Sequence, residues 1–416
     1  MTQAAYELVL LLASIIFMSS KRTNYYDQAI SFGELYKGLK KSCRNVRWKD
    51  SVVGYETNGL RNTFKLSKAL HDGTYRISKY QIFQIHEPKE RTIVASRIVD
   101  RQFQRSLCEC GLYDDITEHF IRDNVACQKG KGTDDALNRL KIHLHRYYRK
   151  YGHDGWVLKC DVHHYFPETR HDIVKKAVQK YVSDPRAAKA VCDVIDSFEG
   201  DVGIGLGSQI SQLIELLLLN DLDHYIKERL RIKYYIRYMD DFVLIHQDKE
   251  YLKYCWREID KWLTARSLHL NEKTEIQPLR HGIIFLKWRF VLTETGKVLM
   301  LMKPEKLSKQ RHRLKKLHEK ELVGKVDAGA TEESLQSFLA NAKRGQTYLM
   351  QKRMIAWYND LTGGTYHDRQ VSSHETRRGS KCHDRAESSK CRGNCRSDRR
   401  ESGKSEPGAE SQGANQ

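Results

Sequence analysis

The sequence predicts an α+β fold of several subdomains. Strand-like and helix-like patterns alternate through the middle of the chain, and the pattern becomes all-helical toward the end. At 416 residues the chain is longer than one typical domain and can bury a core without covalent staples. Its 72 Lys and Arg against 53 Asp and Glu give a formal charge of +19, spread over most of the chain. This balance favours nucleic acid as the partner, with an anionic membrane surface as the lesser alternative.

The cysteines and the N-terminal region indicate a reduced, cytoplasmic protein. Ten cysteines are scattered without repeated CxxC pairs, which argues against a disulfide framework or a zinc ribbon. The apolar run at residues 8–18 is shorter than the roughly 18 residues that a membrane span needs. It also lacks the basic segment and the cleavage site of a signal peptide. We therefore expect no membrane insertion and interpret the run as a buried or dispensable helix.

Helices and one hairpin are expected before residue 151. Apolar positions recur at three and four residues between positions 31 and 70, which indicates amphipathic helices with basic outer faces. Residues 80–95 contain two β-rich runs around a Glu-Pro-Lys-Glu turn. Helical pattern returns near residue 98. A Gly/Lys loop then precedes a basic helix that we expect Thr133 and Asp134 to cap.

The middle of the chain predicts a strand–helix unit and a hairpin. "GWVLKCDVHHYF" is an apolar strand that ends in Asp161, and a helix starts near His171. A Gly-rich loop precedes a long helix, and Tyr235–His246 follows as a hairpin. The remainder predicts a helix over residues 249–268, a strand pair over 285–302 and basic helices over 304–358. Residues 371–416 contain no Leu, Ile, Phe, Trp, Met or Tyr, which predicts a disordered tail.

Two adjacent carboxylates, Asp240 and Asp241, interrupt the apolar hairpin. Neighbouring side chains on a strand point to opposite faces, so a turn is needed to bring both to one point. Like charges at close range repel unless a cation lies between them, and Mg²⁺ is such a cation. Asp161 ends another apolar strand and would join them if the two strands pair. An isolated Asp-Asp is most often a turn, and Asp161 alone could cap a helix. Because Asp161 and the Asp240-Asp241 pair both stand beside apolar strands, their combination favours a catalytic site for two-metal phosphoryl transfer.

The motifs resemble those of reverse transcriptases. "YMDD" at Tyr238–Asp241 is similar to the signature hairpin of that family, and "DVHHYF" at Asp161–Phe166 is similar to its first catalytic motif. Further similar segments run in the family order over roughly residues 75–360: "RTIVASRIVDRQFQRSL", "ACQKGKGTDDALNRL", "LHLNEKT" and "FLKWRF". The resemblance implies a right-hand polymerase. Its parts would be an N-terminal extension (1–30), fingers (31–150), a palm with an antiparallel sheet (151–300), a helical thumb (301–362) and a basic tail (363–416).

The resemblance also implies site residues. Asp161, Asp240 and Asp241, with the main chain of Val162, would hold two Mg²⁺ ions, for which Mn²⁺ can substitute. Phe166 would be a steric gate that rejects ribonucleotides, with a plain core aromatic as the alternative. The other implied dNTP contacts are Arg101, Lys129, Lys131, Gly207, Ser211, Gln212 and Lys273. The implied primer and template contacts are Tyr238, Met239, Phe285, Leu286, Lys287 and Trp288. A solvated basic loop is the alternative for the two loop lysines, and Lys287 stands where the family commonly has glycine.

The segment "GIGLGSQISQ" departs from the common family pattern. Many retroviral and intron enzymes have Pro-Gln-Gly there, whereas this chain has Leu206-Gly207 and then Ser211-Gln212. That spacing resembles reverse transcriptases of diversity-generating retroelements, which make error-prone cDNA from a template repeat. The implied setting is a bacterium or phage, and the implied partners are template RNA, a DNA primer, dNTPs and a small basic accessory protein. Retron-like and phage-defence enzymes share parts of the pattern and remain alternatives, as does a protein-priming or non-catalytic nucleic-acid-binding descendant.

Overall fold

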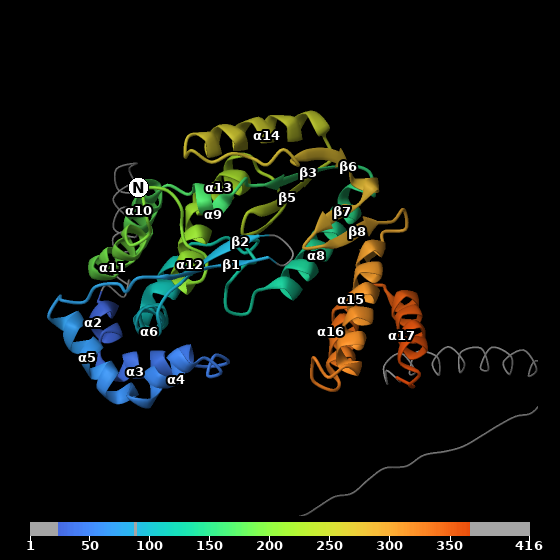
Figure 1. The fold of residues 1–416 in the computed structure, drawn as a ribbon. Helices are drawn as coiled ribbons and strands as arrows, with labels where there is room; N and C mark the ends of the chain where they lie inside the picture. Colours follow the sequence, from blue (N-terminus) through green and yellow to red (C-terminus); the bar gives the residue numbers. More distant parts are fainter. Residues whose placement is uncertain (1–23, 87–89, 367–416) are drawn as a thin grey trace, which may run out of the picture. The chain divides into compact units, whose positions relative to one another are not determined.

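A four-stranded antiparallel sheet carries the acidic residues that the sequence singles out (Figure 1). The computed structural model describes residues 24–86 and 90–366, and the chain falls into two units that divide between Lys303 and Pro304. The sheet belongs to the first unit and has the strand order β4-β5-β3-β6. Its strands are β3 (Trp156–Asp161), β4 (Tyr234–Tyr238), β5 (Asp241–His246) and β6 (Glu275–Pro278).

The sheet forms because its two central strands are apolar on both faces. In β3, Val157 and Leu158 are fully buried, and in β5 the same holds for Phe242 and Val243. Such continuous apolar runs suit strands that are covered on both sides. β3 pairs with β5 along its whole length and with β6 on its other edge. The prediction that the strand ending in Asp161 pairs with the hairpin is therefore confirmed.

Helices cover this sheet and fill the rest of the first unit. α14 (Lys249–Thr264) packs on β3, β5 and β6, and α8 (Thr133–Tyr151) packs on β4. Gly132 occupies the N-cap of α8 without a side-chain hydrogen bond, so the predicted Thr133–Asp134 cap is wrong. The helices before α8 are α2 (Tyr25–Ala29), α3 (Phe32–Ser42), α4 (Asp50–Thr57), α5 (Gly59–His71), α6 (Ile98–Leu107) and α7 (Tyr113–Thr117). Those between β3 and β4 are α9 (Tyr165–Glu168), α10 (His171–Tyr181), α11 (Pro185–Asp196), α12 (Gln209–Leu218) and α13 (Asn220–His224).

Two smaller sheets complete the first unit. The predicted early hairpin is present as β1 (Gln81–Ile85) and β2 (Arg91–Ala95). Where a strand pair was predicted near residue 285, three strands form in the order β7-β8-β9. They are β7 (Ile283–Phe285), β8 (Trp288–Leu292) and β9 (Val298–Met302). This sheet contacts α8, where the Tyr148 hydroxyl donates a hydrogen bond of 2.9 Å to the Glu294 carbonyl.

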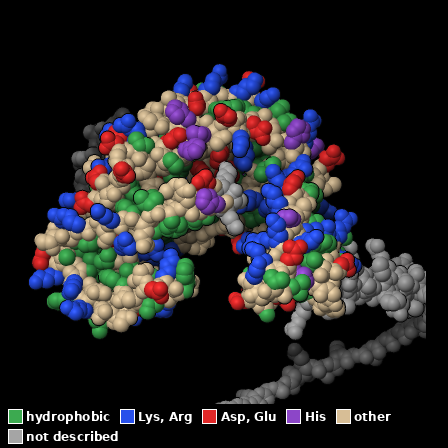
Figure 2. Space-filling view, viewed as in Figure 1, with side chains coloured by type: hydrophobic (Ala, Val, Ile, Leu, Met, Phe, Trp, Pro, Cys, Tyr) green, Lys and Arg blue, Asp and Glu red, His purple; other side chains and the backbone are tan. Residues whose placement is uncertain are grey.

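The second unit is helical, as predicted. It consists, within its described residues, of α15 (Pro304–Leu322), α16 (Ala330–Ala342) and α17 (Tyr348–Thr362), around a small core that includes Leu314, Leu339 and Met354. Figure 2 shows Lys and Arg side chains gathered over α15. In the described part of the chain, no helix is both long and apolar enough to cross a membrane. The predicted disordered tail and the apolar run at residues 8–18 lie outside the described residues.

Candidate active site

Three aspartates lie at one end of the central sheet. Asp161, the last residue of β3, is the cross-strand partner of Asp241, the first residue of β5. Asp240 lies in the turn just before it, and its carbonyl accepts a hydrogen bond of 3.2 Å from the Val162 amide. The pairing of the strands thus brings Asp161 close to two adjacent carboxylates that are distant from it in sequence.

Burial and nearby negative charge disfavour the charged forms of Asp240 and Asp241. Burial raises the pKa of Asp241 to about 7; the charge of Lys159 opposes this, while the charges of Asp161 and Asp240 add to it. Lys159 Nζ lies 3.8 Å from Asp241 Oδ1, which is buried and accepts no hydrogen bond. Burial also raises the pKa of Asp240, and the charge of Asp161 acts in the same direction. A cation placed among these oxygens would relieve the repulsion.

The turn that presents Asp240 and Asp241 is strained at Met239. Tyr238 pairs with Asp241, so Met239 and Asp240 are the two central residues of the turn, and Met239 has a φ of +57°. In hairpins a positive φ at the first central position is normally supplied by glycine, and a larger residue there costs on the order of 1 kcal/mol. Strain of this kind persists where the surroundings enforce it, and it is concentrated at functional sites.

The Gly-rich loop lies along Phe166, the expected gate residue. The Ile204 amide donates a hydrogen bond of 2.9 Å to the Phe166 carbonyl, and the Gly203 amide donates one of 2.8 Å to the Thr169 carbonyl. Phe166 is half-buried and packs against the main core, with its ring edge-on to Tyr165 at 5.9 Å between centroids. Part of its ring is therefore exposed, which a gate requires.

The same loop continues into the first turn of α12 and holds β2. The Leu206 carbonyl accepts a hydrogen bond of 3.0 Å from the Val94 amide, and Gly207 is exposed. Ser211 is fully buried, and its amide donates a hydrogen bond of 2.9 Å to the Ser208 hydroxyl, which caps the helix. Gln212 is exposed. Of the dNTP contacts expected in this segment, Gly207 and Gln212 are open to a ligand, whereas the Ser211 side chain faces the cap.

The two loop lysines differ in how they are held. Lys131 is half-buried, and its Nζ donates a hydrogen bond of 2.9 Å to the Asn124 carbonyl. Burial lowers the pKa of this ammonium. Lys129 Nζ lies over the Tyr113 ring, 4.4 Å from its centroid. Lys131 is therefore bonded within its own segment, whereas Lys129 is exposed and its ammonium lies against the face of a ring in α7.

Arg101 and Lys273 occupy different surroundings. Arg101 lies on α6, a helix that packs against α3, and its Nε is buried without a hydrogen-bond partner. Lys273 is exposed, in a short loop whose Asn271 amide donates a hydrogen bond of 2.7 Å to the carbonyl of Asp161. The Lys273 loop is therefore attached to the end of β3, next to the aspartates.

The expected primer-grip turn forms without a glycine. Leu286 and Lys287 both have positive φ, +48° and +69°, between the paired residues Phe285 and Trp288. Both central residues of a type I′ turn are in this region, so Lys287 does not prevent the hairpin. Phe285 and Trp288 are buried and anchor the turn, while Lys287 is exposed at its tip.

Three residues near the aspartates were missed in the sequence. The pKa of Asp240 is raised by burial, and the charges of Arg91, at the start of β2, and of Arg237 oppose this rise. Glu215 is fully buried in α12; burial raises its pKa, and the charge of Asp240 adds to this. A basic residue at the start of a strand within a family-like motif could have indicated Arg91. No sequence signal marks Glu215 beyond its place in an apolar helix.

A divalent cation fits the chemistry of this donor set, although no complete cluster is formed. Carboxylate and carbonyl oxygens are the ligands that Mg²⁺ prefers, and the buried Asp241 Oδ1 lacks a hydrogen-bond donor. Among residues 24–86 and 90–366, however, no group of three or more His, Cys, Asp or Glu side chains is arranged to hold a metal ion.

Comparison with known proteins agrees with the motifs. The family "Reverse transcriptase (RNA-dependent DNA polymerase)" matches from Ile85, at the end of β1, to Leu286, in the turn between β7 and β8. The match covers just under half of the 416-residue chain. Together with the central sheet and the all-helical second unit, this match confirms the predicted α+β, right-hand polymerase fold. The match does not distinguish a diversity-generating reverse transcriptase from other lineages.

The individual proteins to which the chain is similar share little sequence identity with it. Protein YkfC of Escherichia coli (strain K12) is 28% identical, over 33% of this chain and 47% of that protein, so the chain spans about half of the curated relative. Telomerase from Candida albicans, solved with a fragment of telomeric RNA, is 10% identical with a TM-score of 0.43, over 71% of this chain and 56% of that one. The Sicinivirus 3Dpol RNA-dependent RNA polymerase is 13% identical with a TM-score of 0.43, over 70% and 62%.

Proposed function

We propose that this protein is an RNA-directed DNA polymerase. It adds deoxynucleotides to the 3′-hydroxyl of a DNA primer, with RNA as the natural template. The observation that carries the proposal is the cross-strand pair of Asp161 and Asp241, with Asp240 in the strained turn beside it, inside a segment that matches the reverse transcriptase family. The second unit, whose α15 is rich in Lys and Arg, is proposed as the thumb that contacts the phosphates of the primer–template duplex.

In the proposed mechanism the aspartates hold the metal and other residues hold the nucleotide. Asp161, Asp240 and Asp241, with the Val162 carbonyl, would bind Mg²⁺, which when bound supplies activation of the primer hydroxyl and charge stabilisation for the departing pyrophosphate. Arg91 and Lys273 would neutralise the triphosphate; this role is supported by the electrostatic effect of Arg91 on Asp240 and by the bond from the Lys273 loop to Asp161. Phe166 would exclude the 2′-hydroxyl of a ribonucleotide.

Within this activity, error-prone synthesis for a diversity-generating retroelement is the proposed role. The Leu206–Gln212 segment is held to β2 through the Val94 amide, and Ile204, two residues before it, is held to the Phe166 carbonyl. A sequence change there can therefore alter how the nascent base pair is enclosed. A small basic accessory protein would be a further partner in this role. A cytoplasmic setting agrees with the seven cysteines in the described part of the chain, which are all free thiols.

Primer extension tests the activity. Purified protein is given a defined RNA template, a DNA primer, Mg²⁺ and four dNTPs, and Asp240→Ala is compared with the wild type. We expect Asp240→Ala to abolish extension and to leave RNA binding largely intact, because the change removes a metal ligand and no phosphate contact. Asp248→Ala is the control: Asp248 caps α14 beyond the other end of β5, so this variant removes a carboxylate that lies away from the three aspartates, and its loss of the cap makes it the more demanding test of stability. Extension by Asp240→Ala at the wild-type rate would refute the assignment.

Sequencing of the products tests the role. Mutations concentrated opposite template adenines would support the diversity-generating proposal. Faithful cDNA would instead favour a retron-like enzyme. Template-independent or absent product, from protein that still binds RNA, would favour a protein-priming or non-catalytic descendant.

A further inference from the structure

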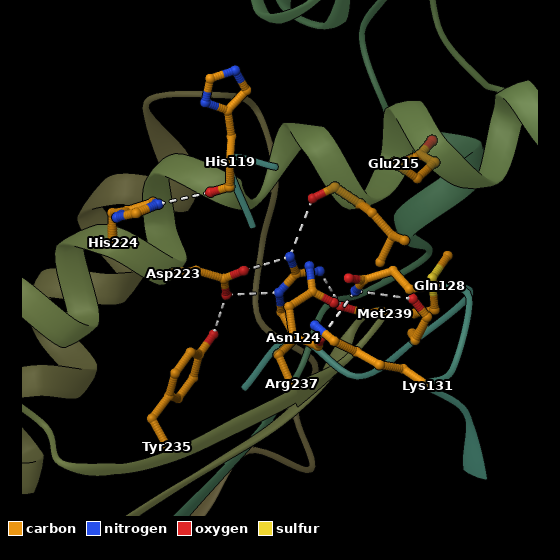
Figure 3. Close-up of polar contacts among 12 residues, drawn as sticks. His119, Asn124, Gln128, Lys131, Glu215, Asp223, His224, Tyr235, Arg237 and Met239 are labelled. Atoms are coloured by element: carbon orange, nitrogen blue, oxygen red, sulfur yellow. Dashed lines mark hydrogen bonds and ion pairs between the residues drawn. The ribbon is translucent and has the colours of Figure 1, made fainter. Parts of the chain in front are cut away.

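The side chain of Arg237, three residues before Asp240, donates four hydrogen bonds, one of them to the catalytic turn (Figure 3). Its guanidinium is fully buried. Nη1 donates a hydrogen bond of 2.9 Å to the carbonyl of Met239, the strained residue of the turn. Nη2 also donates one of 3.1 Å to the Leu216 carbonyl in α12. One side chain therefore joins the turn to the helix that follows the Gly-rich loop.

The charge of Arg237 is balanced by a carboxylate that is equally buried. Nε and Nη2 donate to the two oxygens of Asp223 in α13, at 2.7 and 2.6 Å. The Tyr235 hydroxyl donates a third hydrogen bond, of 2.6 Å, to the same carboxylate. Two-point binding fixes the orientation of a planar guanidinium. Asp223 thus holds Arg237 in the direction from which Nη1 reaches the Met239 carbonyl.

The main chain of Arg237 is fixed as well. Its amide donates a hydrogen bond of 3.0 Å to the Asp123 carbonyl, and its carbonyl accepts one of 3.0 Å from the Val125 amide. The residue between them, Asn124, accepts at its carbonyl from Lys131 Nζ and from Gln128 Nε2. Arg237 therefore contacts two parts of the site. Its main chain is bonded to the segment that carries the loop lysines, and its side chain is bonded to the catalytic turn.

From these contacts we propose that Arg237 is a positioning residue for the polymerase reaction. It holds the Met239 carbonyl and so keeps the turn in the strained form that places Asp240 and Asp241 beside Asp161. This inference rests on the proposed polymerase function. Arg237 touches no reacting atom, so its loss should lower the rate of the chemical step and leave nucleotide binding nearly unchanged.

Three variants separate positioning from simple stability. The double variant Arg237→Met with Asp223→Asn removes both charges together, so that neither is left buried without its partner. Arg237→Lys keeps the positive charge but loses the fixed fork that reaches Asp223, Met239 and Leu216. Tyr235→Phe is the control, because it removes a hydrogen bond to Asp223 and leaves every contact of Arg237 in place.

Two measurements are made on each full-length variant whose circular dichroism matches the wild type. Hydrogen exchange is followed for residues 238–242, and single-nucleotide extension gives the maximal rate and the dNTP concentration at half-maximal rate. We expect faster exchange in the turn and a maximal rate reduced roughly 100-fold in the double variant, since a displacement of about 1 Å has effects of that size. The half-saturating dNTP concentration should stay nearly constant, Arg237→Lys should behave like the double variant, and Tyr235→Phe should resemble the wild type.

The inference would be overturned if the folded double variant showed the hydrogen exchange and the maximal extension rate of the wild type. It would also be overturned if Tyr235→Phe lost as much rate and exchange protection as the double variant. If the double variant does not fold, Arg237→Lys decides the matter by the same two measurements. If the wild type itself does not extend a primer, the proposed function fails, and turn exchange alone still shows whether Arg237 holds the turn.

Discussion

Gly207→Ala should destabilise the first unit more than an ordinary glycine substitution at positive φ. Gly207 has a φ of +135°, and an added Cβ would lie 3.0 Å from the Val94 carbonyl oxygen and 3.7 Å from Ala95 Cα. The backbone strain costs about 1–3 kcal/mol, and crowding against atoms that cannot rotate away costs about 1–3 kcal/mol more. We therefore expect a loss of about 2–6 kcal/mol in the free energy of unfolding.

Gly73→Ala supplies the comparison. Gly73 has a φ of +67° with nothing within 4 Å of the added Cβ, so only the strain of about 1–2 kcal/mol applies. Urea unfolding followed by tryptophan fluorescence and circular dichroism measures both variants. Gly207→Ala should also raise the dNTP concentration at half-maximal extension rate, because Val94 would be pushed away from the Leu206 carbonyl. Equal losses of stability in the two variants would refute the claim that this loop is packed against β2.

Three further predictions concern stability and selectivity. Asp184→Ala should cost about 2–4 kcal/mol in thermal unfolding, because this buried carboxylate caps α11 and also accepts from the Tyr26 amide, whereas Asp184→Asn should keep most of the cap. Burial alone would raise the pKa of Asp123, but its His143 and Lys227 partners outweigh burial and lower it. A lowered pKa means that the ionised Asp123 stabilises the folded protein. This stabilisation is fully present above the pKa of about 3.9 in the unfolded chain and is lost progressively as the pH falls below that value. The difference in free energy of unfolding between wild type and Asp123→Asn should therefore narrow below about pH 4. Phe166→Ala should raise ribonucleotide incorporation relative to dNTP incorporation by about 10–100-fold in competition extension assays, as expected for loss of one pocket contact; an unchanged ratio would assign Phe166 to the core.

Local patterns predicted the elements of the fold well. Strands β3 and β5 could be predicted because each is an apolar run bounded by turn residues. Their acidic ends could be recognised because a carboxylate is unusual next to such a run. The strand pair predicted over residues 285–302 corresponds to β8 and β9, whereas β7 (Ile283–Phe285) was missed because it is only three residues long and starts before that segment. The cap of α8 was assigned to the wrong residues, because Gly132 starts the helix without a side chain.

Local patterns predicted the site only in part, since its supports come from contacts across the fold. The hydrogen bond from Arg237 to the Met239 carbonyl depends on Asp223. Nothing in the sequence distinguishes Asp223 from an exposed acidic residue on a helix. Similarly, Ser211 carries a family-like signal, but its position in the first turn of α12 directs its side chain to Ser208. These side-chain partners depend on which face of each helix or strand packs against the rest of the fold. That packing cannot be derived from the pattern of a single sequence.

The register of the central sheet explains why two charged residues can stand in an apolar hairpin. Phe242, Val243, Leu244 and Ile245 are all buried, and each faces a residue of β3 in the alignment that sets Asp161 opposite Asp241. A slip by one residue would move every side chain of β5 to the other face and place Phe242 opposite Asp161. The apolar residues therefore fix the position of the aspartates, which repel one another and contribute no stability of their own. In this arrangement the core sets where the carboxylates lie along the sheet, while the contact from Arg237 to Met239 sets how the turn presents them.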